Sequence, residues 1–137
     1  MKKLSAALIL LIGLATAALA QTGSSNVNVA TQKSVAVTIS TATTTKLITE
    51  NGTQSIYITA VDIIAAGTGN IQFIGGTGAT CGTGTVNITG NYQLTAQVGF
   101  TKGNGAGVVW VVPPGLALCA VTSAAVAMPG SIAYAQF

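Results

Sequence analysis

The sequence feature that most constrains the fold is a series of short apolar and polar alternations separated by turn residues. The longest alternation covers residues 92–100, and another covers residues 35–39. Side chains of a strand point alternately to its two faces, so a period of two indicates half-buried strands. About eight to ten such segments, with turn signals between them, predict an all-β fold, namely a single antiparallel β-sandwich of jelly-roll-like topology.

Turn signals suggest how these strands are connected. Asn51-Gly52 predicts a hairpin between strands at 43–49 and 55–65, because Asn-Gly favours the tight turns of hairpins. Pro129-Gly130 predicts a further turn before the final strand. Residues 124–128 fit either a strand or a helical turn, because they are rich in alanine but lie between strands.

The apolar residues of the segment 55–65 change phase partway along it. Ile56 and Ile58 fall on one face of a strand, whereas Val61 and Ile63 fall on the other. One extra residue at position 59 or 60, a β-bulge, would return all four side chains to one face. The alternative is a strand that crosses from one sheet to the other.

Residues 75–84 read Gly-Gly-Thr-Gly-Ala-Thr-Cys-Gly-Thr-Gly and contain five of the glycines. Glycine reaches backbone angles that other residues avoid, so this run predicts a tightly turned loop and not a helix or a straight strand. Ordering a free loop of this kind would carry a large entropic cost. Cys81 lies within the run, and Cys119 is the only other cysteine of the chain.

In an exported chain, two cysteines predict one disulfide, Cys81–Cys119. The closed loop of about 38 residues corresponds to roughly 3–4 kcal/mol of stabilisation in the chain-entropy model. The alternatives are two buried free thiols or a metal site. A metal site needs about four ligands, and the chain has no histidine and only two carboxylate side chains. We therefore expect no metal and no cofactor.

Residues 1–20 have the pattern of an export signal. Lys2 and Lys3 precede an apolar run too short to span a bilayer comfortably, and Ala18-Leu19-Ala20 places small residues where a signal peptidase cleaves. We expect cleavage before Gln21, with a retained membrane anchor as the alternative. The rest would comprise a leader and first strand or strands at 21–42 and a β-sandwich domain at 43–137. Such a product would be secreted, periplasmic or on the cell surface, without a membrane span.

Charged residues make up only 5% of the chain, far below the roughly 25% of ordinary globular domains. After removal of residues 1–20, three lysines and two carboxylates leave a net charge of +1. No basic patch then remains for nucleic acid. A surface so poor in charge is prone to self-association. It is either kept soluble by hydroxyl and amide groups or buried in an assembly.

The residue types that carry most enzymatic chemistry are missing. Without histidine, neither a Ser-His-Asp nor a Cys-His arrangement can form. Glu50 and Asp62 are the only carboxylate pair for glycosidase-like chemistry. We expect Glu50 to be a solvated turn residue, and Asp62 to face water or pair with a lysine. The sequence therefore predicts a protein that is not an enzyme.

Trp110, Tyr92 and Tyr57, with Tyr134 as a fourth, are the candidates for stacking against a sugar or contacting a partner. Each residue type is more commonly found in a core or half-buried on a strand. Trp110 is distinctive because residues 108–112 are apolar on both faces. A free-standing sandwich would leave one of these faces in water, so we expect an inner strand or a subunit interface there.

Three segments together resemble a recurring set of small phage and bacterial β domains. They are the Cys-Gly-Thr-Gly of residues 81–84, Leu118-Cys119 after a proline-glycine turn, and the terminal Ala133-Tyr134-Ala135-Gln136-Phe137. The resemblance covers residues 43–137 and brings no assigned activity. It implies a surface, attachment or virion-associated β domain, for which a trimer is one expected assembly. The export signal favours a secreted or cell-surface product.

These features predict an exported, disulfide-linked β-sandwich that acts as a structural or adhesive surface module and self-associates. One alternative is a glycan-binding module that uses exposed aromatic side chains. Another is a virion decoration or attachment domain. A third is a hydrolase built on Glu50 and Asp62.

Overall fold

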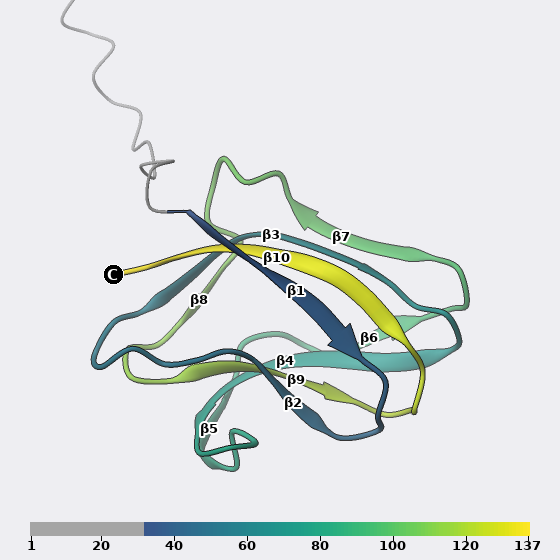
Figure 1. The fold of residues 1–137 in the computed structure, drawn as a ribbon, viewed down its shortest axis with the longest axis horizontal. Coiled ribbons are helices and arrows are strands. Elements are labelled where there is room, and N and C mark those ends of the chain that lie inside the picture. The colour runs from purple at the N-terminus through teal and green to yellow at the C-terminus, as the bar shows by residue number, and fades with distance from the viewer. Residues whose placement is uncertain (1–31) are drawn as a thin grey trace, which may run out of the picture.

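The computed structural model describes residues 32–137, which form two antiparallel sheets packed face to face (Figure 1). The predicted export signal, its cleavage position and most of the leader lie outside these residues. Sheet A contains, in order, β1 (Lys33–Ile39), β10 (Met128–Gln136), β3 (Ile56–Ile64) and β7 (Gly99–Gly103), and β8 (Trp110–Val112) also pairs with β3. Sheet B contains, in order, β2 (Thr44–Ile48), β9 (Ala117–Thr122), β4 (Gly69–Thr77) and β5 (Thr83–Asn87), and β6 (Tyr92–Leu94) also pairs with β4.

The order of the strands is that of a jelly roll. β1 pairs with β10, β2 with β9, β3 with β7 and β8, and β4 with β5 and β6, always antiparallel. From β1 to β4 the chain alternates between the two sheets. A long hairpin rolled up in this way is the double-sheet jelly roll. The predicted all-β sandwich is confirmed, and β1 is part of it.

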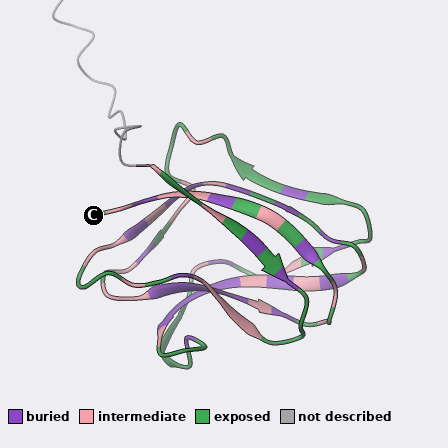
Figure 2. Cartoon of the chain, in the orientation of Figure 1, coloured by how far each residue is buried: buried purple, intermediate pink, exposed green. Residues whose placement is uncertain are grey.

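The core lies between the sheets, and β3 contributes much of it (Figure 2). The predicted bulge in β3 is confirmed, because the pairing with β10 passes from Ala60 to Ile58 and leaves Thr59 as the extra residue. The Thr59 carbonyl instead accepts a hydrogen bond from the amide of Gly105, at 3.1 Å. The bulge brings four β3 side chains to the same buried face: Ile56, Ile58, Val61 and Ile63.

The predicted hairpin at Asn51-Gly52 is wrong in its pairing. The turn itself forms, since the Gln54 amide donates to the Asn51 carbonyl at 3.1 Å and Gly52 has a φ of 55°. However, β2 pairs with β9 in sheet B, whereas β3 lies inside sheet A with partners on both sides. Because β3 has no free edge for β2, the turn is a corner between the sheets.

The alternation at 92–100 is not a single strand, which corrects a second prediction. β6 ends at Leu94 in sheet B, and β7 begins at Gly99 in sheet A. Between them Gln97 has a φ of 64°, and its amide donates to the Ala65 carbonyl at 2.8 Å. Leu94 and Phe100 both face the core, whereas Ala96 and Val98 between them are exposed, so the burial pattern is interrupted where the chain changes sheet.

Pro129-Gly130 does not form the predicted turn, because both residues lie within β10. Pro129 is opposite Thr38 of β1, and the pairing of β10 with β3 begins only at Gly130. The missing N–H of proline is therefore not needed towards β3. Residues 124–127 are neither helix nor strand.

Candidate functional site

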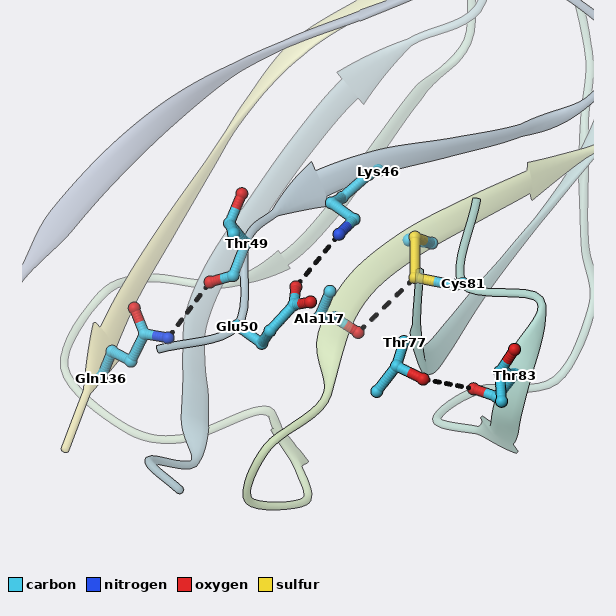
Figure 3. Close-up of polar contacts among 9 residues, drawn as sticks. Lys46, Thr49, Glu50, Thr77, Cys81, Thr83, Ala117 and Gln136 are labelled. Atoms are coloured by element: carbon cyan, nitrogen blue, oxygen red, sulfur yellow. Dashed lines mark hydrogen bonds and ion pairs between the residues drawn. A yellow bond between two sulfur atoms is a disulfide. The ribbon is translucent and has the colours of Figure 1, made fainter. Parts of the chain in front are cut away.

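The glycine-rich run folds back onto sheet B, where Figure 3 shows Cys81 beside Ala117 of β9. The prediction of a loop throughout 75–84 is wrong at its ends, because β4 extends to Thr77 and β5 begins at Thr83. The intervening turn uses Gly78 at a φ of 84° and Cys81 at a φ of 53°. These left-handed angles let the chain reverse within a few residues.

Cys81 and Cys119 form the predicted disulfide, with Cα atoms 6.3 Å apart. Both are fully buried, and with Ile74 and Ala117 they form a small cluster separate from the main core. Gly76 lies beneath the loop, and a Cβ atom there would come within 2.4 Å of the Cys81 carbonyl oxygen. Glycine at this position therefore allows the loop to lie directly on the sheet.

Trp110 and Tyr92 are brought together, but with their rings among core aromatics. The Trp110 ring lies 5.1 Å from Phe73 and 6.4 Å from Tyr92, and Tyr92 lies 4.6 Å from Phe100, between centroids. Trp110 is opposite Ile58 in the β3–β8 pair, so it points to the buried side of sheet A. These two candidates close one margin of the sandwich and do not form a flat external platform.

Tyr57 lies apart from that group, on the outer side of sheet A. Its ring stacks on Phe137 with centroids 4.4 Å apart and an interplanar angle of 14°. Val111 is directly opposite Tyr57 in the β3–β8 pair. The sequence reasoning did not choose Phe137 as a candidate. Its position at the end of an alternating strand, on the face opposite to Ile132 and Tyr134, was the signal available for it.

The two carboxylates lie at different places in the fold. Glu50 follows β2 and pairs with Lys46, with Oε2 and Nζ 3.0 Å apart (Figure 3). Asp62 lies near the far end of β3, six residues beyond Ile56, which corresponds to about 20 Å of strand. Its Oδ1 accepts a hydrogen bond from the Thr101 hydroxyl at 3.1 Å. A hydrolytic mechanism that needs both carboxylates in one cleft finds no support in this geometry.

No pocket and no group of three metal-ligating side chains occurs within residues 32–137. That part of the chain also contains no helix long and apolar enough to cross a membrane. Comparisons with models of protein families, with curated proteins and with solved structures gave no match. The candidate functional surface is therefore defined by its exposed side chains alone.

The pKa of the Glu50 carboxyl is lowered, first by a backbone hydrogen bond and then by Lys46. A lowered pKa adds stability above the pKa of the unfolded chain, and this contribution disappears as the pH falls through the folded-state pKa. We expect Lys46→Met to raise the pKa of Glu50 in an NMR titration without restoring its ordinary value, because the backbone hydrogen bond remains. Lys33→Met is the control and should leave the pKa of Glu50 unchanged. An unchanged Glu50 pKa in Lys46→Met would contradict the assigned cause.

Proposed function

We propose that this protein is an exported, non-enzymatic structural or adhesive surface module that acts through contact surface and associates with copies of itself. The observation that carries the proposal is the outer side of sheet A, where apolar side chains are exposed and charge is nearly absent. Val111 is 45% exposed and Phe137 is 58% exposed, beside the half-buried Tyr57. Large exposed apolar side chains in one place are typical of interaction sites.

The few ionisable side chains do little to keep this surface in water. Within residues 32–137 five side chains carry a charge at neutral pH, and two of them, Lys46 and Glu50, neutralise each other as an ion pair. The Lys102 ammonium lies 5.9 Å from the ring centroids of both Tyr92 and Phe100, so it covers the aromatic margin. Asp62 is the one charged side chain among the outward residues of β3. Low surface charge removes the electrostatic repulsion that normally opposes association.

Export is supported by the pattern of residues 1–20 and by the disulfide. Structural disulfides persist in oxidising compartments and are rare in the cytosol, so Cys81–Cys119 is compatible with a secreted, periplasmic or cell-surface protein. The same compartments suit an adhesive module. A virion decoration or attachment domain would use the same contact surface, but it would not need an export signal.

Size-exclusion chromatography with light scattering on the exported protein tests the proposal. We expect the average mass to rise with concentration towards a dimer or trimer, because apolar surface leaves water on association. Phe137→Ser should leave the fold intact, since the side chain is exposed, and it measures whether the outer face of sheet A contributes to this association. A monomer at every concentration would overturn self-association.

A glycan-binding module is the second candidate, and the flat Tyr57–Phe137 stack favours it. Sugar rings stack on exposed aromatic faces, and hydroxyl or amide groups nearby would supply hydrogen bonds. The discriminating result is a monomer that binds members of a glycan array and loses binding in Tyr57→Ala. Retained binding in that variant would exclude the aromatic pair as the sugar site.

A further inference from the structure

The four long sides of the two sheets differ in how they are protected against pairing with another strand. An exposed strand edge offers unpaired N–H and C=O groups, and proteins usually block it with bulges, inward-pointing charges or very short strands. The residues that the structure describes allow each edge to be compared. Three of the four edges are short or irregular along their length, whereas β1 carries only one such device, the charge of Lys33 at its first residue.

The margin of sheet B at β2 is blocked. β2 has only five residues, its pairing with β9 shifts between Lys46 and Ile48, and Lys46 places a charge on it. The opposite margin of sheet B is divided between β5 and β6, and the pairing of β5 with β4 shifts between Gly75 and Thr77. Neither margin presents a long straight edge to a second molecule.

The margin of sheet A at β7 and β8 is also blocked. The two strands have five and three residues and meet β3 at different places. Lys102 is opposite the fully buried Val61, so this lysine is on the core-facing side of β7. An inward-facing charge on an edge strand is a device that prevents a further strand from adding there.

β1 carries a protecting charge only at its first residue, since Lys33 is opposite the core-facing Tyr134, and the rest of the strand carries none. Its seven residues pair with β10 in continuous register from Lys33 to Ile39 without a shift. It contains no proline and no charge after Lys33. Among the residues that the structure describes, only β10 pairs with β1, which leaves its other edge open.

The sequence of β1 is compatible with pairing to itself. In an antiparallel pair centred on Ala36, Val35 would face Val37 and Ser34 would face Thr38 of the second copy, and Ala36 would face Ala36. β-branched and hydroxyl pairs of this kind stabilise neighbouring strands. Lys33 would face Ile39, so the two lysines would be separated by six residues, or about 20 Å. This distance exceeds the Debye length of about 8 Å at physiological salt, so their repulsion is screened.

We infer that β1 is the self-association edge, and that two copies of this chain pair β1 to β1 antiparallel about Ala36, which joins their A sheets into one continuous sheet. A two-fold interface of this type is closed, so it produces dimers and not fibres. The inference rests on the proposed function because it names the surface through which self-association occurs.

The area of this contact indicates how strong the dimer is. A seven-residue edge about 23 Å long, in a sandwich with sheets about 10 Å apart, buries only a few hundred Å². Stable interfaces bury about 800 Å² per partner, so we expect a reversible, concentration-dependent dimer.

Cysteine cross-linking tests the register. In Ala36→Cys the two introduced thiols would lie directly opposite each other, with Cα atoms about 5 Å apart, which suits a disulfide. We expect this variant to form a covalent dimer under mild oxidation. Ser34→Cys alone should not cross-link, because its two copies would be about 13 Å apart along the strands. An equal mixture of Ser34→Cys and Thr38→Cys should cross-link. The native cysteines do not interfere, since both are buried in their own disulfide.

A charge substitution tests the edge without cross-linking. Ala36→Lys would place two lysines opposite each other, and like charges there are destabilising. We expect its dimer dissociation constant to rise roughly fivefold or more. Thr101→Lys is the matched control, because Thr101 is an exposed residue of β7 on the opposite margin of sheet A. It should associate like the unsubstituted protein, and circular dichroism should show that both variants are folded.

The outcomes separate this inference from the proposed function. A protein that remains monomeric at high concentration overturns both. A protein that self-associates, but whose Ala36→Cys variant does not cross-link and whose Ala36→Lys variant is unaffected, overturns only the β1 edge. In that case, cross-linking of Ala133→Cys instead would place the contact on the outer face of sheet A. A further outcome is a monomer in which the amides of β1 resist hydrogen exchange. This would mean that residues upstream of Gln32 cover the edge of β1, and it would also contradict the inference.

Discussion

Loss of the Cys81–Cys119 disulfide is expected to lower the free energy of unfolding by about 3–4 kcal/mol, the chain-entropy value for the 38-residue separation of the two cysteines. For a domain of this size the melting temperature should fall by roughly 15–25 °C. Two contributions produce this effect. The unfolded chain gains freedom when the link is removed, and the turn at 78–82 loses its attachment to β9.

The measurement compares thermal melts of oxidised protein with protein reduced in denaturant and refolded with reductant. Reduction in denaturant is needed because both sulfur atoms are buried in the folded protein. The refolded thiol form keeps nearly the same side chains, so it isolates the link itself. The double variant Cys81→Ala/Cys119→Ala should be slightly less stable than the reduced protein, because it also loses the packing of the sulfur atoms in the small cluster with Ile74.

Limited proteolysis provides the structural readout. The reduced protein should be cleaved first within the glycine-rich turn, whereas the oxidised protein should resist cleavage there. A melting temperature that does not change on reduction would contradict the stabilising role of the disulfide. Cleavage that begins elsewhere, for instance between β7 and β8, would show that the turn is held by other contacts.

Gly130→Ala is expected to lower the free energy of unfolding by about 3 kcal/mol or more, at the upper end of the cost of overpacking. β10 lies between β1 and β3, and Gly130 is opposite Val37 on one side and Ile63 on the other. A Cβ atom there would lie 2.0 Å from the Asp62 carbonyl oxygen and 2.8 Å from the Ile63 Cα atom. Both are backbone atoms of β3, so they cannot rotate away, and the two central strands would have to separate.

Gly99→Ala is the matched control for this substitution. Gly99 also lies in a strand of sheet A, but nothing lies within 4 Å of a Cβ atom added there. Its stability should change by no more than about 1 kcal/mol, because only the freedom of the unfolded chain is reduced. Urea denaturation of both variants measures the difference. Equal stabilities would show that β10 and β3 can adjust to a side chain at position 130.

Local signals predicted the strands well because side-chain periodicity reports which faces are buried. The phase change in β3 is an example: four apolar side chains could reach one face only if an extra residue lay between Ile58 and Val61, and Thr59 is that residue. The disulfide was predictable by the same kind of reasoning, since Cys81 has a single intrachain partner.

The same signals were misleading where the chain changes sheet. Residues 92–100 alternate in sequence, yet they belong to two sheets: Leu94 and Phe100 face one core from opposite sides, and Val98 between them is exposed. Pro129-Gly130 predicts a turn, but both residues lie in β10, where Pro129 is beyond the pairing with β3 and needs no N–H on that side. In each case the outcome depended on a neighbouring strand far away in the sequence.

The candidate site was only partly predictable for a related reason. Trp110, Tyr92 and Tyr57 are all aromatic residues on predicted strands, and none of their sequences shows which side the ring takes. Trp110 and Tyr92 point between the sheets and pack on Phe73 and Phe100, whereas Tyr57 points outward and stacks on Phe137. The direction of each side chain follows from the register with its partner strand, which the sequence of one segment does not contain.

The sequence by itself determined that the chain is all-β, which side chains alternate, that the apolar residues of β3 change phase near residue 59, and that Cys119 is the one possible intrachain partner of Cys81. These properties depend on residues close together in the chain or on a count of residue types. The tertiary structure alone decided which strands pair, that the Asn51-Gly52 turn is a corner between sheets, and that within residues 32–137 β1 pairs only with β10. Strand pairing depends on hydrogen bonds and buried contacts between distant segments, so its energy is set only when the whole jelly roll has closed.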